Sequence, residues 1–276
     1  MVGISLYSVI PVRTEPKESA EQSTQILFGE TYDLLEQIPR WHKVRLHSDG
    51  EEGWIDAKMS TPLSSKEYRE YKAAYREAAY ILFPMAYAVS ENNGQTIPLT
   101  AGTRLTNYQN GHFSVLGVGF RIDPTMVTPQ PLELNEQNLQ QVVRFFLNTP
   151  YLWGGKNALG MDCSGFTQTI MSLFGKKLPR NASQQAVQGR ALRVIRNARA
   201  GDIAFFNHGD GKISHVGIIL STFNSPLSTF NFTIVHCSGR VKVERLDEKG
   251  ILSVEKSNIE CPNGSYSHDL VTIRRL

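Results

Sequence analysis

One cysteine at the start of an apolar segment constrains this chain more than any other feature of its sequence. The stretch YLWGGKNALGMDCSGF contains Cys163 near its end, and Gly175 follows twelve residues after it. Between them apolar residues recur at helical spacing, at Phe166, Ile170, Leu173 and Phe174. We expect a helix with Cys163 in its first turn, where free N–H groups and the helix dipole favour a thiolate. The placement indicates a nucleophile, with a buried inert thiol as the alternative.

Two histidines on later β-rich segments could supply the base that a cysteine nucleophile needs. His215 lies in ISHVGIIL and His236 lies in FTIVHCSG. If these segments form neighbouring strands, one imidazole would take the thiol proton and the other would orient the first by a hydrogen bond. A single histidine on a strand is usually structural, but two histidines together with a cysteine at a helix start favour catalysis.

Composition excludes several classes of protein. The chain has 276 residues, 41% of them hydrophobic, a net charge of +3 and three cysteines. This is typical of a soluble globular protein, too weakly basic to indicate nucleic-acid binding. The cysteines form neither a disulfide framework nor a CxxC metal site, so we expect no metal and no cofactor. The N-terminus lacks the pattern of an export signal, and no window approaches the ~20 apolar residues of a membrane span. We therefore expect a cytoplasmic protein, or a periplasmic or secreted one if a signal has been removed.

The chain divides into four segments by pattern. Residues 1–62 carry short β-rich runs separated by turn residues, which is typical of a small barrel. Residues 63–80 change to a helical period, with Ser64 and Glu67 spaced as a capping box. Residues 81–129 return to short β runs and weakly repeat the first segment. Residues 130–276 combine a helix capped by Asn135, the Cys163 helix and several β runs, which predicts an α+β domain.

An ordered set of motifs carries a resemblance to a known family. YLWGG, DCSGF, GDIAFF, SHVGIIL and IVHCSG occur in that order. The set resembles the NlpC-type papain-like cysteine peptidases that cut bacterial cell-wall peptides. The preceding β segments resemble bacterial SH3-like domains. The resemblance implies a papain-like peptidase domain over residues 130–276, preceded by SH3-like barrels over residues 1–62 and 81–129 and by a connecting helix over residues 63–80.

The resemblance also implies catalytic roles. Cys163 would be the nucleophile, His215 the general base and His236 the residue that orients the base. Tyr151, with the backbone N–H of Cys163, would stabilise the oxyanion. The segment STFNSPLSTFNF between the two histidines departs from the family pattern and implies a longer hairpin loop.

Within that family the chain most resembles γ-D-glutamyl-L-diamino acid endopeptidases with N-terminal SH3-like domains. These imply a monomer that cleaves short murein peptides with a free N-terminal L-Ala, in cell-wall turnover or recycling. A carboxylate can bind the free amino group by a charge-assisted hydrogen bond. The resemblance implies five substrate-binding residues: Glu52, Tyr87, Asp162, Ser164 and Ser183. Three alternatives stay open: Glu51 in place of Glu52, Asp162 as a helix cap, and Tyr87 as barrel packing.

Two other functions remain open from the sequence. The chain could be a cell-wall peptide-binding protein with an inactive peptidase domain. It could also be a papain-like amidase or acyltransferase, because the strand motifs do not specify the acyl acceptor.

Overall fold

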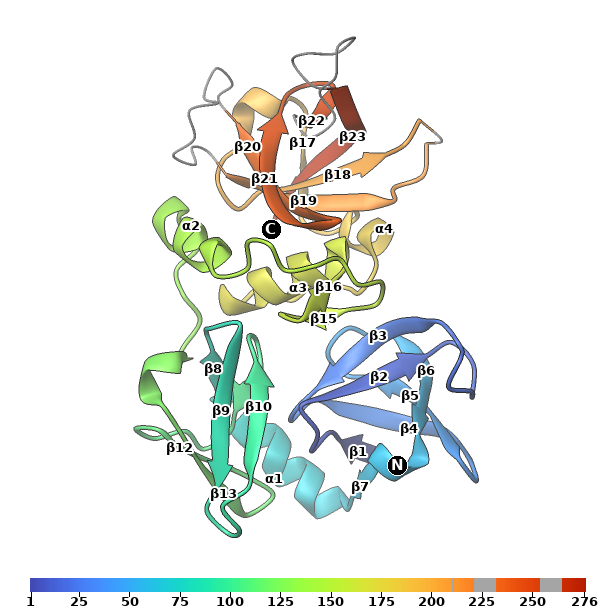
Figure 1. Ribbon diagram of the computed structural model, residues 1–276, viewed down its shortest axis with the longest axis vertical. Coiled ribbons are helices and arrows are strands. Elements are labelled where there is room, and N and C mark those ends of the chain that lie inside the picture. Colours follow the sequence, from blue (N-terminus) through green and yellow to red (C-terminus); the bar gives the residue numbers. More distant parts are fainter. Residues whose placement is uncertain (210, 221–231, 254–264) are drawn as a thin grey trace. The chain divides into compact units, whose positions relative to one another are not determined.

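The computed structural model describes residues 1–209, 211–220, 232–253 and 265–276, and it is built mostly from β-strands (Figure 1). Contacts divide the chain into two compact units. The first unit comprises Met1–Leu132, Trp153–Ala158 and Met171–Lys177. The second comprises Glu133–Leu152, Leu159–Ile170 and Leu178–Leu276. The chain therefore crosses between the units at several points, two of them on either side of the Cys163 segment.

An antiparallel sheet in the order β3-β2-β6-β5-β4-β1-β7 forms the N-terminal part of the first unit. Its strands are β1 (Val2–Ile4), β2 (Val9–Arg13), β3 (Gln22–Leu27), β4 (Thr31–Ile38), β5 (Trp41–Leu46), β6 (Glu52–Asp56) and β7 (Thr61–Leu63), with a 3₁₀ turn η1 (Ala57–Met59). Alternate strand residues point inward, as expected of strands with one buried face. Eight of these inward residues, including Ile10, Val44 and Ile55, form a buried apolar core.

Helix α1 (Ser65–Arg76) begins with the predicted capping box of Ser64 and Glu67. Two further sheets follow it, in the orders β10-β9-β13-β12 and β11-β8-β14. Their strands are β8 (Ala79–Ile81), β9 (Met85–Ser90), β10 (Thr96–Thr100), β11 (Arg104–Leu105), β12 (His112–Val115), β13 (Val118–Ile122) and β14 (Val127–Thr128), with η2 (Pro124–Met126). Their apolar core also contains Ile4, Phe28 and Tyr71, so the two β regions and α1 share one buried cluster.

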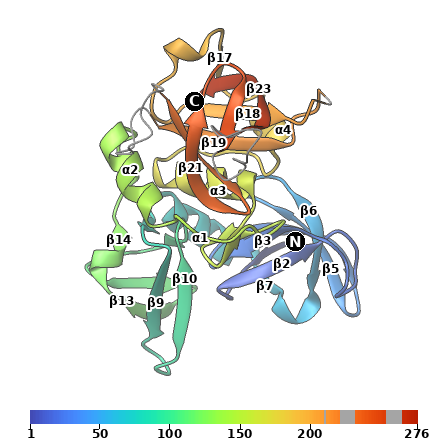
Figure 2. The same cartoon turned by 45° about the horizontal axis from the view of Figure 1, so that its top comes forward.

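A seven-stranded antiparallel sheet dominates the second unit, in the order β17-β23-β18-β19-β20-β21-β22. Figure 2 shows much of it in orange and red. Its strands are β17 (Arg190–Leu192), β18 (Ile203–Asn207), β19 (His215–Leu220), β20 (Thr233–Ser238), β21 (Arg240–Leu246), β22 (Gly250–Ser253) and β23 (Ser265–Arg275). An additional pairing of β22 with β23 closes six of these strands into a ring.

Helices and short elements complete the chain. They are α2 (Glu136–Arg144), β15 (Lys156–Asn157), β16 (Gly160–Met161), α3 (Cys163–Leu173), α4 (Ala182–Gln185) and η3 (Ile195–Asn197). Helix α2 begins at the predicted cap, because the Asn135 side chain accepts the Asn138 N–H. Helix α3 begins at Cys163 as predicted, and it ends before Gly175, whose φ of 69° is a conformation that glycine adopts without strain. No helix in the described part of the chain has the length and apolar character needed to cross a bilayer.

Candidate active site

The start of α3 is built around Asp162, which holds Cys163 in place. Asp162 Oδ1 accepts the Gly165 N–H at 2.7 Å, and the Asp162 carbonyl accepts the Phe166 N–H at 2.9 Å. This is the geometry of a helix N-cap, so the cap proposed for Asp162 is confirmed. Cys163 follows immediately and is only 7% exposed.

Backbone pairing within the second unit places Tyr151 beside the start of α3. Its N–H donates to the Gly239 carbonyl at 2.9 Å, and it forms a parallel bridge with Met161. Because Met161 lies two residues before Cys163, this bridge sets the tyrosine beside the helix start. Burial raises the pKa of Tyr151, and Cys163 and Asp162 raise it further. The phenol therefore keeps its proton and can act as a hydrogen-bond donor.

His215 and His236 lie on adjacent antiparallel strands, as the sequence predicted. Strands β19 and β20 pair with Gly217 opposite His236, and His215 Nε2 lies 2.8 Å from His236 Nδ1. A side chain at Gly217 would come within 2.9 Å of the His236 Cβ, so glycine is required for this close approach. The longer hairpin loop predicted from STFNSPLSTFNF falls almost wholly within residues 221–231, outside the described residues.

Glu244 on β21 continues the row of histidines. Its Oε2 lies 2.9 Å from His236 Nε2 and 3.4 Å from Lys242 Nζ, and Ser253 donates a hydrogen bond to its Oε1. Burial opposes ionisation of Glu244, but the bonds from His236 and Ser253 and the Lys242 charge outweigh it and lower its pKa to about 2. The row therefore ends in a buried carboxylate that stays ionised at neutral pH.

Burial opposes ionisation of the Cys163 thiol, whereas the helix start favours the thiolate. Burial, with the Asp162 charge next, raises its pKa to about 11. Backbone N–H groups of Val216 and Ser164 act in the opposite direction without reversing the shift. The helix end is outweighed because a nearly dry site disfavours any new charge. The Val216 amide also places the thiol against β19, next to His215.

His215 rests neutral. Burial lowers its pKa well below 6.5, and the neighbouring imidazoles of His236, His268 and His208 lower it further. Nε2 faces His236, so Nδ1 is the ring nitrogen available for proton exchange with the thiol. The resting pair is thus a neutral thiol and a neutral imidazole, and the proton must move as the nucleophile attacks.

A pocket with a volume of about 240 Å³ opens onto these groups. It is lined by Tyr151, Cys163, His208, Ser214, His215, Cys237, Ser238, Gly239 and His268. The His268 ring stacks on His215, with ring centroids 4.2 Å apart and an angle of 26° between the planes. All nine residues belong to the second unit, so this unit alone assembles a thiol, a base and an oxyanion donor around one cavity.

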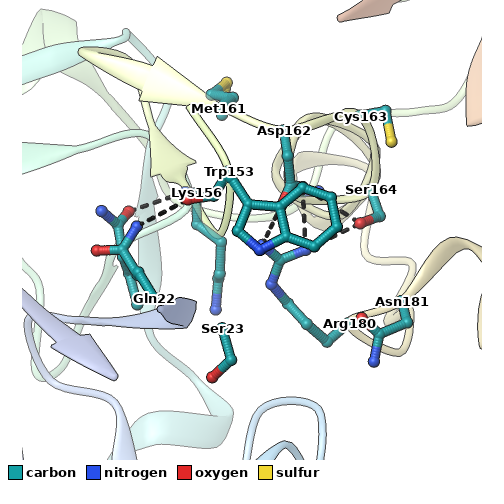
Figure 3. A network of polar contacts seen from close by, with 12 residues as sticks. Gln22, Ser23, Trp153, Lys156, Met161, Asp162, Cys163, Ser164, Arg180 and Asn181 are labelled. Carbon is teal, nitrogen blue, oxygen red and sulfur yellow. Dashed lines mark hydrogen bonds and ion pairs between the residues drawn. The ribbon is translucent and has the colours of Figure 1, made fainter. Parts of the chain in front are cut away.

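Two of the predicted substrate-binding residues, Asp162 and Ser164, lie in a buried network with Arg180 (Figure 3). Arg180 is 1% exposed, forms a two-pronged ion pair with the Asp162 carboxylate, and donates to Ser164 Oγ at 2.9 Å. Gln185 supports the network by donating to the Ser164 carbonyl at 3.1 Å. The Asp162 charge is therefore already balanced, and a substrate ammonium would have to compete with a buried guanidinium.

The remaining predicted binding residues are exposed. Ser183 lies on the surface of α4 in the second unit. In the first unit, Tyr87 on β9 is 61% exposed, which rules out barrel packing as its role. Glu52 on β6 is exposed and pairs with Arg45 at 2.7 Å and Lys43 at 3.6 Å. The half-buried Glu51 donates its own N–H to Asp49 Oδ1. The choice between the two glutamates stays a prediction.

Sequence reasoning missed Glu244, Arg180 and His268. Glu244 occurs in VKVERL, where charged and apolar residues alternate as on a strand with one exposed face. Arg180 occurs in LPRNASQQ, a segment without periodicity. The one available signal was the carboxylate eight residues after His236, because a side chain on the next strand of a sheet can meet a histidine. Among the described residues no group of histidine, cysteine, aspartate or glutamate side chains could hold a metal ion.

Comparisons with known proteins agree with this geometry. The NlpC/P60 family profile matches residues 148–257, which contain the thiol and both histidines. A gamma-D-glutamyl-L-lysine dipeptidyl-peptidase of Bacillus subtilis is 31% identical over 212 residues, or 71% of this chain and 68% of that protein. This chain belongs to the NlpC/P60 family. It is accordingly a cysteine peptidase of a family that acts on the bacterial cell wall.

Other comparisons extend over the N-terminal part of this NlpC/P60 protein. A bacterial dipeptidyl-peptidase Sh3 domain profile matches residues 12–58. A gamma-D-glutamyl-L-lysine dipeptidyl-peptidase of Bacillus cereus is 27% identical over 230 residues, covering 73% of this chain and 65% of that protein. The chain thus spans about two thirds of the length of both Bacillus relatives.

A crystal structure of an NlpC/P60 family protein from Bacillus cereus has the same fold, with a TM-score of 0.76 at 19% identity, and covers 100% of this chain and 99% of that one. An NlpC/P60 endopeptidase from Photobacterium damselae gives a TM-score of 0.75 at 13% identity, covering 99% of this chain and 72% of that one. The fold is therefore papain-like with an SH3-like N-terminal domain, whereas the second SH3-like barrel stays a prediction.

Proposed function

We propose that this protein is a cysteine endopeptidase that hydrolyses the γ-D-glutamyl-L-diamino acid bond of short murein peptides carrying a free N-terminal L-Ala. The observation that carries the proposal is the meeting of Cys163, His215 and Tyr151 in one pocket. The relatives named for γ-D-glutamyl-L-lysine peptides support this choice of bond. The physiological role would be the turnover or recycling of murein peptides.

The geometry supports an acyl-enzyme mechanism. As the Cys163 sulfur attacks the γ-glutamyl carbonyl carbon, its proton passes to His215 Nδ1. Tyr151 donates a hydrogen bond to the oxyanion, together with the backbone N–H of Cys163. When the C–N bond breaks, His215 returns the proton to the leaving amine of the diamino acid. A water molecule, deprotonated by His215, then cleaves the thioester and releases L-Ala-D-Glu.

Recognition of the free amino group is the finer part of the proposal. Asp162 is the carboxylate next to the nucleophile, and its bond to Arg180 orients it but also neutralises it. Glu52 is held only by exposed ion pairs, which contribute at most about 1 kcal/mol, so it can exchange partners with a substrate ammonium. We therefore expect Glu52 to contribute by charge, with Tyr87, Ser164 and Ser183 offering further contacts.

Mass spectrometry of L-Ala-γ-D-Glu-L-Lys and L-Ala-γ-D-Glu-diaminopimelate, each incubated with the protein, tests the proposal. The wild type should release the free diamino acid, and Cys163→Ala should reduce release by at least about 10³-fold while the protein stays folded. Cys237→Ala is the matched control, because Cys237 is a second buried cysteine of the same pocket. It should keep measurable hydrolysis.

Blocked peptides test the amine requirement separately. Acetylation of the L-Ala amino group should sharply reduce cleavage, because the ammonium charge is lost. Equal rates for blocked and free peptides would remove the role given to Glu52 and Asp162. Near wild-type release by Cys163→Ala would instead remove the nucleophile assignment, and no release from either peptide by the wild type would refute the proposed substrate.

A further inference from the structure

The row of polar groups in the second unit extends beyond the three residues that the sequence singled out. It runs from the thiol of Cys163 through His215 and His236 to the carboxylate of Glu244, with Ser253 behind it. His236 is fully buried and Glu244 is 6% exposed. A carboxylate carried this far into a sheet needs partners, and its partners here lead directly to the base.

Glu244 determines which nitrogen of each imidazole carries a proton. An ionised carboxylate only accepts hydrogen bonds, so His236 must be protonated at Nε2, 2.9 Å away. His236 Nδ1 is then an acceptor, and His215 must donate to it from Nε2 across 2.8 Å. His215 Nδ1 is left with its lone pair, which is the form that can take the proton of Cys163.

The charge of Glu244 also affects the proton-transfer step. When His215 takes the thiol proton it becomes cationic inside a cluster of other basic groups. His268 on β23, His208 beyond the end of β18 and Lys242 on β21 oppose that charge, as does burial. Across the row, Glu244 is the negative group on the far side of His236, and at short range in a dry site it favours the imidazolium.

We propose that Glu244 is a positioning residue of the peptidase, which fixes the reactive tautomer of His215 and stabilises its imidazolium through His236. The inference rests on the proposed roles of Cys163 and His215. It predicts that the reactivity of the thiol depends on a carboxylate that never touches the substrate.

A purely structural role is the competing explanation, because Glu244 also binds Lys242 and Ser253. The test must therefore report on the thiol itself. The pH dependence of Cys163 alkylation by iodoacetamide does so without any peptide substrate, provided that mass spectrometry of the digested protein assigns the label to Cys163. Only the thiolate reacts, so the rate measures how far the thiol proton has moved to His215.

Glu244→Gln keeps the shape and an acceptor but removes the charge. We expect its Cys163 alkylation at pH 7 to fall at least about tenfold, because each unit lost from the His215 pKa reduces the ion-pair population tenfold. The remaining reactivity should rise only at high pH, as for a thiol without a base. Glu244→Asp should restore part of the rate, and Glu248→Gln, at an exposed position between β21 and β22, should match the wild type.

Outcomes separate the two explanations. If Glu244→Gln alkylates at the wild-type rate and pH, or if Lys242→Met slows alkylation equally, the inference is overturned and the carboxylate is structural. Thermal unfolding of each variant identifies one that merely fails to fold, and Glu244→Asp then decides. Failure of the proposed substrate would leave the alkylation result unchanged, so the two proposals fail independently.

Discussion

Each of the two units buries a cluster of charged side chains, and the clusters differ in what they can do. In the second unit, Glu244 lies at the end of two histidines that lead to a thiol. In the first unit, Lys156 Nζ lies 3.5 Å from Glu30 and 3.9 Å from Asp49, and all three side chains are largely buried. One cluster contains imidazoles that lead from a carboxylate to a thiol, and the other contains a lysine paired directly with carboxylates.

The cluster of the first unit holds one short segment of chain. Gln25 Oε1 accepts the Lys156 N–H at 2.8 Å and the Asn157 side-chain amide at 2.9 Å. The Trp153 indole donates to Glu21 at 2.6 Å. Gln22 donates to the Trp153 carbonyl at 3.1 Å, and both residues are labelled in Figure 3. These bonds tie Trp153–Ala158 to the N-terminal sheet, although Trp153 itself is 60% exposed.

Burial of charge does not by itself identify an active site. Both clusters are largely buried, but the histidine row opens onto a pocket and contains a base that rests neutral. In the Lys156 cluster a buried lysine pairs with two largely buried carboxylates, Glu30 and Asp49. Substitutions in the two clusters should therefore separate activity from stability.

The largest expected effect is on activity. His215→Ala should reduce kcat by at least about 10³-fold, because the thiol of Cys163 loses the imidazole proposed to take its proton. Lys156→Ala should change kcat far less. Steady-state hydrolysis of the γ-glutamyl peptide by both variants is the measurement. A Lys156→Ala loss as large as that of His215→Ala would erase the distinction drawn between the clusters.

Cys163, His215 and His236 were predictable from the sequence, because each lies in a short local motif. DCSGF places a cysteine at a helix start, and SHVGIIL and IVHCSG place histidines within strands. Their adjacency followed once β19 and β20 paired. The pKa of the Cys163 thiol could not be predicted in this way. The helix start lowers this pKa, whereas burial raises it, and burial depends on the whole fold.

Other parts of the fold depended on contacts distant in sequence. Lys156 looks like an ordinary loop lysine, and only the docking of its segment on Gln25, more than a hundred residues earlier, makes it buried. The core that joins Phe28 and Tyr71 to the later β-strands likewise has no local signature. Patterns specify elements and faces, but the partners of a buried charge are set by tertiary structure.

Stability should respond most to the cluster of the first unit. Lys156→Ala should cost about 3–5 kcal/mol of unfolding free energy, because it leaves Glu30 and Asp49 buried without their cation. Lys17→Ala is the matched control, since Lys17 pairs with Glu15 on the surface and should cost well under about 1 kcal/mol. Urea unfolding followed by fluorescence measures both, and equal losses would show that burial of Lys156 has no special cost.

A smaller effect is expected from pH, and it falls on the histidine row. Because burial lowers the pKa of His215, its neutral form persists below the ordinary value of 6.5. The acid limb of kcat/KM should therefore fall below pH 6.5, and the stability that His215 contributes should be present above 6.5 and lost as pH falls through its lowered pKa. A pH profile of kcat/KM beside unfolding curves checks this. An inflection at or above 6.5 would contradict the neutral resting base.

The smallest effect on stability is expected at Glu52, where function and stability should separate most clearly. Glu52→Gln removes exposed ion pairs with Arg45 and Lys43, so unfolding free energy should change by less than about 1 kcal/mol. If Glu52 meets the substrate ammonium, KM for the free peptide should rise several-fold, while the slow cleavage of the acetylated peptide stays unchanged. Glu51→Gln, at the neighbouring half-buried position, is the comparison that decides between the two carboxylates. A KM change confined to Glu51→Gln would transfer the amine contact to that residue, which lies directly before β6 and differs from Glu52 in its burial.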